Sequence, residues 1–94
     1  MIIGACTVHI SLPGIASLKD KRHTLKPLLH SLRQEFEVAA AEIGEQDRWQ
    51  SAVLAIVIVA NEDAQVYRVL ERAIRWMGTE FPNVDLLDWD IELR

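Results

Sequence analysis

The segment Ala52–Ala60, with the sequence AVLAIVIVA, constrains the fold more than any other segment because every side chain in it is apolar. It is far too short to cross a bilayer, which takes about 20 residues of helix. A strand that is apolar on both sides lies in the middle of a sheet and is covered, or nearly covered, on both faces. The rest of the chain must therefore supply flanking strands and a layer that packs on the sheet.

Three other segments show the alternating pattern of strands. Residues 1–12 carry an apolar set on one side and a mixed set on the other, and they end at a Pro-Gly turn. Phe36–Ile43 predicts an edge strand, and Gly44–Arg48 predicts the hairpin that joins it to the apolar segment. Val84–Leu93 predicts a last strand with acidic residues on one face. Its other face carries Leu87, Trp89, Ile91 and Leu93.

A first helix follows the Pro-Gly turn, and conflicting residues determine where it begins. Ser17 has the sequence context of an N-cap. Pro27 would cost ~3 kcal/mol in a helix interior, and Lys21 would fall among the leucines of the apolar arc. We therefore predict an irregular lead-in over residues 18–23 and a regular helix that begins near Thr24.

A second helix is predicted between Asn61, as its N-cap, and Gly78, as its C-terminal cap. Its apolar residues recur with the helical period. They are Val66, Leu70, Ala73, Ile74 and Met77.

The order β-α-β-β-α-β predicts one α+β domain over residues 1–94 with the ferredoxin-like fold, a four-stranded antiparallel sheet with two helices on one face. Right-handed crossovers place the first and third strands in the centre. Cys6, Val8 and Ile10 are expected to face the helices. Either phase of Ala52–Ala60 can then face the open side, and both make its middle apolar. We expect a homodimer through this face or an edge strand; the alternative is a monomer whose long side chains partly cover the face.

The chain is acidic overall, with a net charge of −4, yet one stretch is strongly basic. Residues 17–33 hold a single acidic residue and five basic ones, which are Lys19, Lys21, Arg22, Lys26 and Arg33. On a helical wheel, one arc carries Lys19, Arg22, His23, Lys26, His30 and Arg33.

Two interpretations of the basic stretch remain open. It can be a solvated face, partly paired with Glu35, Glu37 or the second helix. It can also bind an anionic partner, and structured RNA or the ribosome fits best. On the second interpretation, the five basic residues of the stretch form an RNA- or anion-binding site.

The hairpin Gly44–Gln50 is the second candidate site. Glycine at its start would permit a positive φ, and Trp49 is a large apolar anchor with one N–H donor. The segment can be simply a well-built hairpin. It can also contact a partner through Gln46, Asp47, Arg48 and Trp49.

Other kinds of site find little support. An RNA-recognition sheet stacks bases on aromatic residues of its central strands, and residues 2–12 and 51–60 contain no Phe, Tyr or Trp. His9 can face Asp88 or Asp90 across neighbouring strands, but such pairs are usually structural. His23 and His30 lie too far apart in sequence to share one metal on a helix. We predict no catalytic residue, no metal, no cofactor and a non-enzymatic protein.

Cys6 is the sole cysteine, so neither an intramolecular disulfide nor a cysteine-based metal cluster can form. It is expected to lie in the core as an inert small apolar residue. The first residues lack the pattern of a signal peptide. We therefore expect a cytoplasmic protein without a membrane partner.

Two blocks give the sequence a family resemblance. Ser17–Arg22 reads SLKDKR, Gly44–Gln50 reads GEQDRWQ, and a closing strand of alternating acids follows. Together they resemble the YlxP-like family of small bacterial proteins of unknown function. The resemblance implies a ferredoxin-like fold. It also implies an RNA or ribosome role, because genes of this family often lie among those for translation initiation and ribosome maturation factors. It brings no established catalytic residues.

The function expected from the sequence is that of an accessory factor that binds RNA or the ribosome through the basic first-helix region. The alternative is a homodimeric regulatory or small-ligand domain with no nucleic-acid role.

Overall fold

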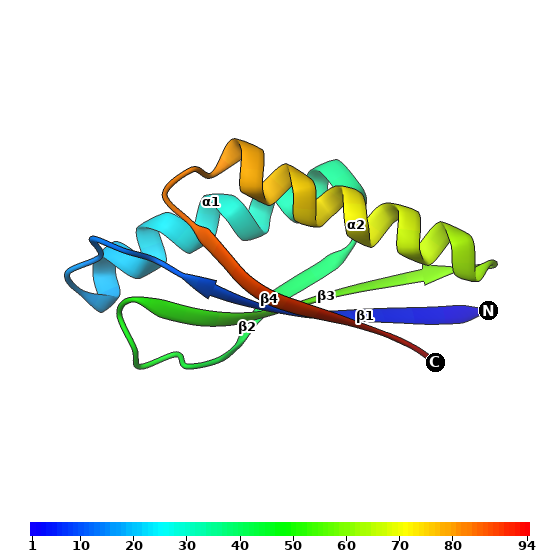
Figure 1. Ribbon diagram of the computed structural model, residues 1–94, viewed down its shortest axis with the longest axis horizontal. Helices are drawn as coiled ribbons and strands as arrows, with labels where there is room; N and C mark the ends of the chain where they lie inside the picture. Colours follow the sequence, from blue (N-terminus) through cyan, green and yellow to red (C-terminus); the bar gives the residue numbers. More distant parts are fainter.

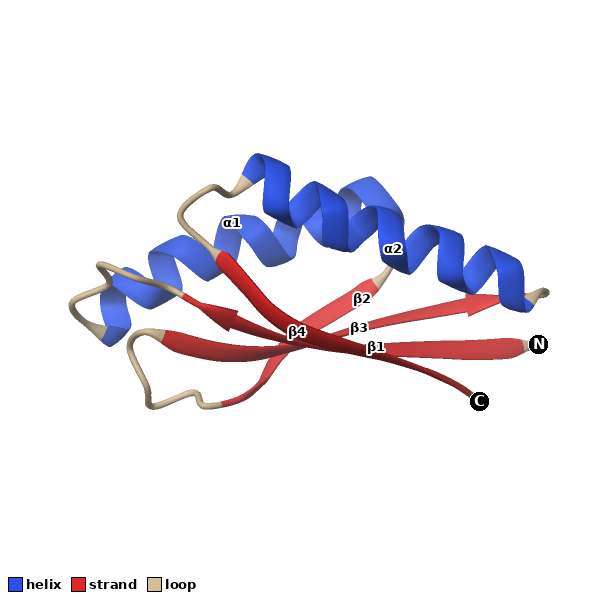
Figure 2. Ribbon diagram, in the orientation of Figure 1, coloured by secondary structure: helices blue, strands red, loops and turns tan.

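The computed structural model describes all residues from Met1 to Arg94. Figure 1 shows the elements in chain order. They are β1 (Ile2–Ser11), α1 (Leu18–Phe36), β2 (Ala39–Gly44), β3 (Ser51–Ala60), α2 (Asp63–Glu80) and β4 (Asp85–Leu93). The strands form one antiparallel sheet in the order β2-β3-β1-β4, with both helices on the same face (Figure 2). The predicted ferredoxin-like fold is confirmed, with β1 and β3 in the centre.

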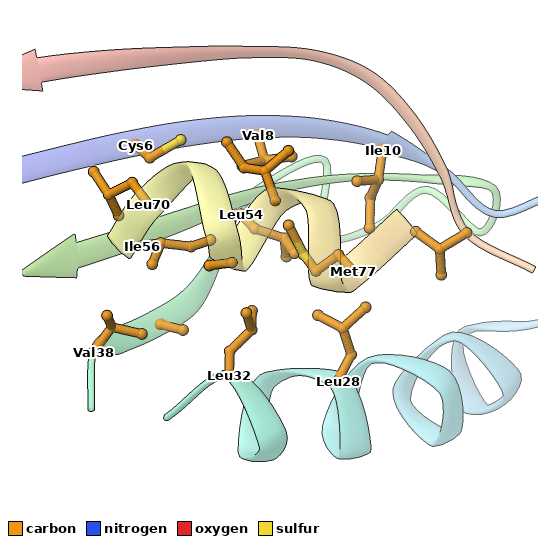
Figure 3. Close-up of a cluster of buried hydrophobic side chains, with 14 of the residues drawn as sticks. Cys6, Val8, Ile10, Leu28, Leu32, Val38, Leu54, Ile56, Leu70 and Met77 are labelled. Carbon is orange, nitrogen blue, oxygen red and sulfur yellow. The ribbon is translucent and has the colours of Figure 1, made fainter. Parts of the chain in front are cut away.

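The core lies between the sheet and the two helices. Cys6, Val8 and Ile10 face the helices as predicted, and Leu54 and Ile56 show which phase of β3 joins them. Burying such side chains contributes about 25 cal/mol for each Å² of apolar surface removed from water. Figure 3 shows β1 and β3 side chains opposite the helix residues Leu28, Leu32, Leu70 and Met77. The open face therefore receives Val53, Ala55, Val57 and Val59 from β3.

The prediction that α1 begins after Lys21 is wrong, because the helix starts at Leu18 and includes Pro27. Ser17 is its N-cap, and its Oγ accepts a hydrogen bond from the backbone N–H of Asp20 at 3.0 Å. Pro27 is exposed, so water can solvate the carbonyl of His23 that the missing N–H would have bonded. Lys21 does fall among the leucines, and the structure buries it there.

Three other boundaries differ from the prediction. Phe36 ends α1 and does not open β2, since its ring packs edge-on against Trp76 at 5.6 Å. Asn61 does not cap α2; Glu62 is the N-cap residue, without a side-chain capping bond. Gly78 does not end α2, which continues to Glu80 because Phe81 packs on Trp76 and its N–H bonds back into the last turn.

The face assignment of Leu87 is also wrong. The register between β1 and β4 shifts at a bulge, so Leu87 has no partner in β1. Leu86 packs against the core, whereas Leu87 is 62% exposed. The extra residue thus breaks the alternation that placed Leu87 on the same face as Trp89.

No helix of the structure combines the length and the apolar composition that a membrane crossing requires.

Candidate functional site

The outward side of α1 carries what we call the basic face. Its residues are Lys19, Arg22, His23, Lys26, His30 and Arg33, and all six are exposed. Because the helix is regular from Leu18 onward, these positions stay on one side, and with Pro27 they line an open depression of about 690 Å³. No acidic and no apolar residue other than proline lines this depression. The structure therefore brings the six residues of the predicted arc together.

The charges of the basic face are not neutralised within the chain. The structure contains two ion pairs, Lys21–Glu42 and Arg94–Glu92, and neither involves this face. The pairing with Glu35, Glu37 or α2 that belonged to the first interpretation is thus absent. Arg33 alone has an internal partner, because its Nε and Nη2 donate to the carbonyl of Ala40 at 3.1 and 2.7 Å. The remaining cations are available to an external anion.

Lys21 lies on the opposite side of α1 and is 2% exposed. Its ammonium donates hydrogen bonds to the carbonyl oxygens of Glu45 and Arg48, at 2.8 and 2.7 Å. It also lies 2.7 Å from Oε2 of Glu42, a buried oxygen that has no hydrogen-bond partner besides this ion pair. Three oxygens around one ammonium match its three donors. Lys21 is therefore occupied, and of the predicted anion-binding residues it is the one that an external ligand cannot reach.

The partners of Lys21 all belong to β2 and the β2–β3 hairpin. The hairpin turn closes through the N–H of Arg48, which bonds the carbonyl of Glu45 at 3.0 Å. The positive φ of the turn belongs to Glu45, at 58°, and not to Gly44 as predicted. Gly44 instead permits a close approach, because a Cβ there would lie 3.2 Å from Cβ of Val53. Two sets of hydrogen bonds fix the hairpin. One is the backbone bond within the turn, and the other comes from Lys21 of α1.

The two sequence blocks therefore meet in space. Lys21 of the first block bonds the second, and Gln50 of the second block donates from Nε2 to the carbonyl of Ile15 at 3.1 Å, next to the first block. Gln46, Asp47, Arg48 and Trp49 are exposed on the hairpin held in this way. Sequence reasoning missed this junction. The sequence feature that could have revealed it is Lys21, which falls within the leucine arc of the helical wheel. Such a lysine indicates either that the helix begins later or that its ammonium is buried with its own acceptors.

The other candidate groups form no site. The register pairs His9 with Asp88, but no hydrogen bond or ion pair joins them. Cys6 is buried, and burial raises the pKa of its thiol to about 11, which makes it a poor nucleophile. No three side chains of the His, Cys, Asp or Glu type are grouped as a metal site would need.

Comparison with known proteins finds a similar chain in Bacillus subtilis (strain 168), the uncharacterized protein YlxP. The two are 31% identical over 84 residues, which cover 89% of this chain and 90% of YlxP. A family model described as "Protein of unknown function (DUF503)" matches residues 3–91.

Solved structures share the fold at low sequence identity. A de novo designed protein with a ferredoxin fold has a TM-score of 0.64 and 11% identity, covering 100% of this chain and 86% of the design. The designed protein Foldit4 has a TM-score of 0.55 and 12% identity, covering 100% of this chain and 97% of Foldit4. The structured domain of Drosophila melanogaster Boca has a TM-score of 0.51 and 12% identity, covering 94% of this chain and 95% of that domain. At these identities the likeness concerns the fold alone.

Proposed function

The chain belongs to the YlxP-like family of unknown function (DUF503), and we propose that it is a non-enzymatic cytoplasmic accessory protein that binds structured RNA, on its own or in the ribosome. The observation that carries the proposal is the basic face of α1. Its cations gather in one depression that no acidic residue lines, and none of them forms an ion pair, in a protein whose net charge is −4. An acidic protein that keeps such a surface unpaired is suited to an anionic partner.

The shape of the surface favours phosphates over a small metabolite. The depression is open and runs along α1. It can therefore lie against a phosphate backbone, but it does not enclose a small molecule. The sheet offers little support for base stacking, because β1 and β3 carry no Phe, Tyr or Trp. Backbone contacts of this kind give affinity and salt dependence but little sequence selectivity.

The test is the binding of the purified protein to bacterial ribosomal subunits, and to RNA extracted from them, over a series of salt concentrations. Each phosphate contact contributes about 0.7 to 0.9 to the slope of log affinity against log salt. The variant Lys19→Glu/Arg22→Glu/Lys26→Glu should lose most of the binding and most of this slope, with an unchanged circular dichroism spectrum.

A matched control has the same change in net charge. Arg68→Glu/Arg72→Glu/Arg75→Glu reverses three exposed cations on α2, outside the basic face. It should bind within about twofold of the natural protein. Equal loss in both variants would show that net charge alone drives the binding, and no loss in either would remove the proposal.

A second function is favoured by a separate observation, the apolar open face of the sheet. Val59 on this face is 61% exposed, and its neighbours in β3 are small or β-branched. In a homodimeric regulatory or small-ligand domain, the second subunit or the ligand would cover this face. Light scattering at micromolar concentration distinguishes the monomer from the dimer. A measured mass of 10.7 kDa, that of one chain, would exclude the dimer.

A further inference from the structure

β4 forms a free edge of the sheet. It pairs with β1 on one side only, so the backbone N–H and C=O groups along its other side have no strand partner. Free edges of this length are usually shortened, covered or charged, because they accept strands from other chains. This edge is nine residues long and carries charges, but no helix or loop covers it.

A groove follows this edge on the helix side of the sheet, lined by residues of β4 and α2. Its volume is about 640 Å³. Ile74, Leu86 and Ile91 give it an apolar lining, and the partly exposed rings of Tyr67 and Trp89 also line it. The charged residues Glu71, Arg75 and Asp90 complete the lining together with Gly78. Side chains of an added strand that point toward the helices would enter this groove.

The two faces of β4 differ in chemistry. Toward the open face, Asp88 and Asp90 stand opposite His9 and Thr7 of β1, and Glu92 continues the row. All three carboxylates are exposed, and only Glu92 has a cation partner, the exposed Arg94 at 3.1 Å. A strand added to this edge would therefore meet a largely apolar groove on one side and a row of negative charges on the other.

This pattern selects the occupant. A second copy of β4 would set carboxylates against carboxylates, which is unfavourable across neighbouring strands. The other free edge of a second copy, β2, has the sequence AAAEIG and offers no cation. A strand that alternates basic and apolar side chains satisfies both faces, because its period of two matches the pleat.

We propose that the β4 edge and the β4–α2 groove bind an extended peptide segment of a partner protein in which basic and apolar residues alternate. The segment pairs with β4 as a fifth strand, places its apolar side chains in the groove, and directs its basic side chains toward Asp88, Asp90 and Glu92. This surface lies on the opposite edge of the sheet from β2 and does not depend on RNA binding by α1.

The probe is a labelled octapeptide of alternating lysine and valine, used at concentrations where it is monomeric by sedimentation. A peptide with the same composition in the order KKVVKKVV keeps the charge but loses the alternation. Fluorescence anisotropy at 0.15 M salt should show at least tenfold tighter binding of the alternating peptide. Equal affinities would overturn the proposal.

A substitution can fill the groove without weakening the fold. Gly78 lines the groove inside α2, and a Cβ there would make only an ordinary contact, 3.6 Å from Leu86. Gly78→Leu should reduce peptide affinity at least tenfold without lowering the melting temperature, since leucine is a better helix former than glycine. Thr79→Leu, next in the helix and outside the groove, should bind as the natural protein does. Unchanged binding by Gly78→Leu would contradict the proposal.

Strand pairing itself has a direct test. Alternating peptides are N-methylated on every second residue in one of two frames, so that only one frame blocks the N–H groups that face β4. One methylated peptide should lose at least tenfold in affinity and the other should not. Equal binding of the two methylated peptides would overturn strand addition.

Discussion

Lys19 and Lys21 stand two residues apart on α1, and the structure uses them in opposite ways. Lys19 is exposed on the basic face without an ion pair, whereas Lys21 is 2% exposed and bonded to three oxygens of β2 and the hairpin. Two residues along a helix rotate a side chain by about 200°. The same kind of charge therefore stabilises the fold on one side of the helix and remains free for a partner on the other.

The difference shows that a cluster of charge in sequence is not a cluster in space. The SLKDKR block combines a basic surface with the anchor of a distant hairpin. A buried ammonium with its partners removed is costly, while an exposed one is nearly neutral to stability. Substitutions on the two sides should thus separate stability from binding.

The largest effect is expected for Lys21→Met, which keeps the stem and removes the ammonium. It leaves the buried oxygen of Glu42 unpaired, and it removes the ammonium donor from the carbonyls of Glu45 and Arg48, of which Glu45 keeps the N–H of Arg48. The free energy of unfolding should fall by about 3–5 kcal/mol, measured by urea denaturation. Lys19→Met, the matched control, should change it by less than about 0.5 kcal/mol. Equal losses of unfolding free energy in the two variants would contradict the proposed difference between the two sides of α1.

A smaller effect comes from the coupling between Lys21 and Glu42. If much of the cost of Lys21→Met is the abandoned carboxylate, removing that carboxylate first should reduce the cost. In a Glu42→Leu background, Lys21→Met should cost less by about 1–3 kcal/mol. A double-mutant cycle in urea measures this. Strict additivity would mean that the cost of Lys21→Met comes from the lost carbonyl contacts and not from the unpaired carboxylate.

Cys6 provides a buried ionisable group without an ion-pair partner. Burial raises the pKa of its thiol from 9.0 to about 11, so the folded protein retains this proton after the unfolded chain has lost it. Stability then falls as pH rises above 9, by about 1.4 kcal/mol per unit at most. Between pH 8 and 10, the natural protein should lose about 1.4 kcal/mol more than Cys6→Ala. If the free energies of unfolding of the two proteins changed equally with pH, burial of the Cys6 thiol would not have the predicted effect.

The smallest effect on stability is expected on the basic face. Single reversals such as Lys26→Glu should change the free energy of unfolding by no more than about 0.5 kcal/mol, because the side chain is exposed and unpaired. Affinity for ribosomal subunits should nevertheless fall. A loss of several kcal/mol in stability would indicate that this side of α1 also holds the fold together.

Much of the fold was readable because periodicity reports burial. The apolar segment Ala52–Ala60 fixed the central strand, and the alternation in residues 1–12 identified the residues that face the helices. The arc of the basic face was also readable, since it depends only on helical geometry. The absence of ion pairs on this arc could not be predicted, because side-chain pairing depends on where Glu35 and Glu37 lie in the folded protein.

Three of the wrong predictions share one cause, which is a tertiary contact that overrides a local preference. Acceptors from a distant hairpin make Lys21 acceptable inside the apolar arc. Packing on Trp76 extends α2 past Gly78 as far as Glu80. A bulge against β1 turns Leu87 out of its expected face. In each case the deciding partner lies in another element, and sequence periodicity does not reveal it.

The most direct test of the division along α1 is a lysine-labelling measurement. Lys19, Lys21 and Lys26 are the only lysines, so an amine-reactive reagent followed by mass spectrometry reports on this helix, apart from the N-terminus. In the free protein, Lys19 and Lys26 should react readily and Lys21 should be protected. Added ribosomal subunits should then protect Lys19 and Lys26. Ready labelling of Lys21 in the folded protein, or labelling of Lys19 and Lys26 that saturating subunits leave unchanged, would contradict this account.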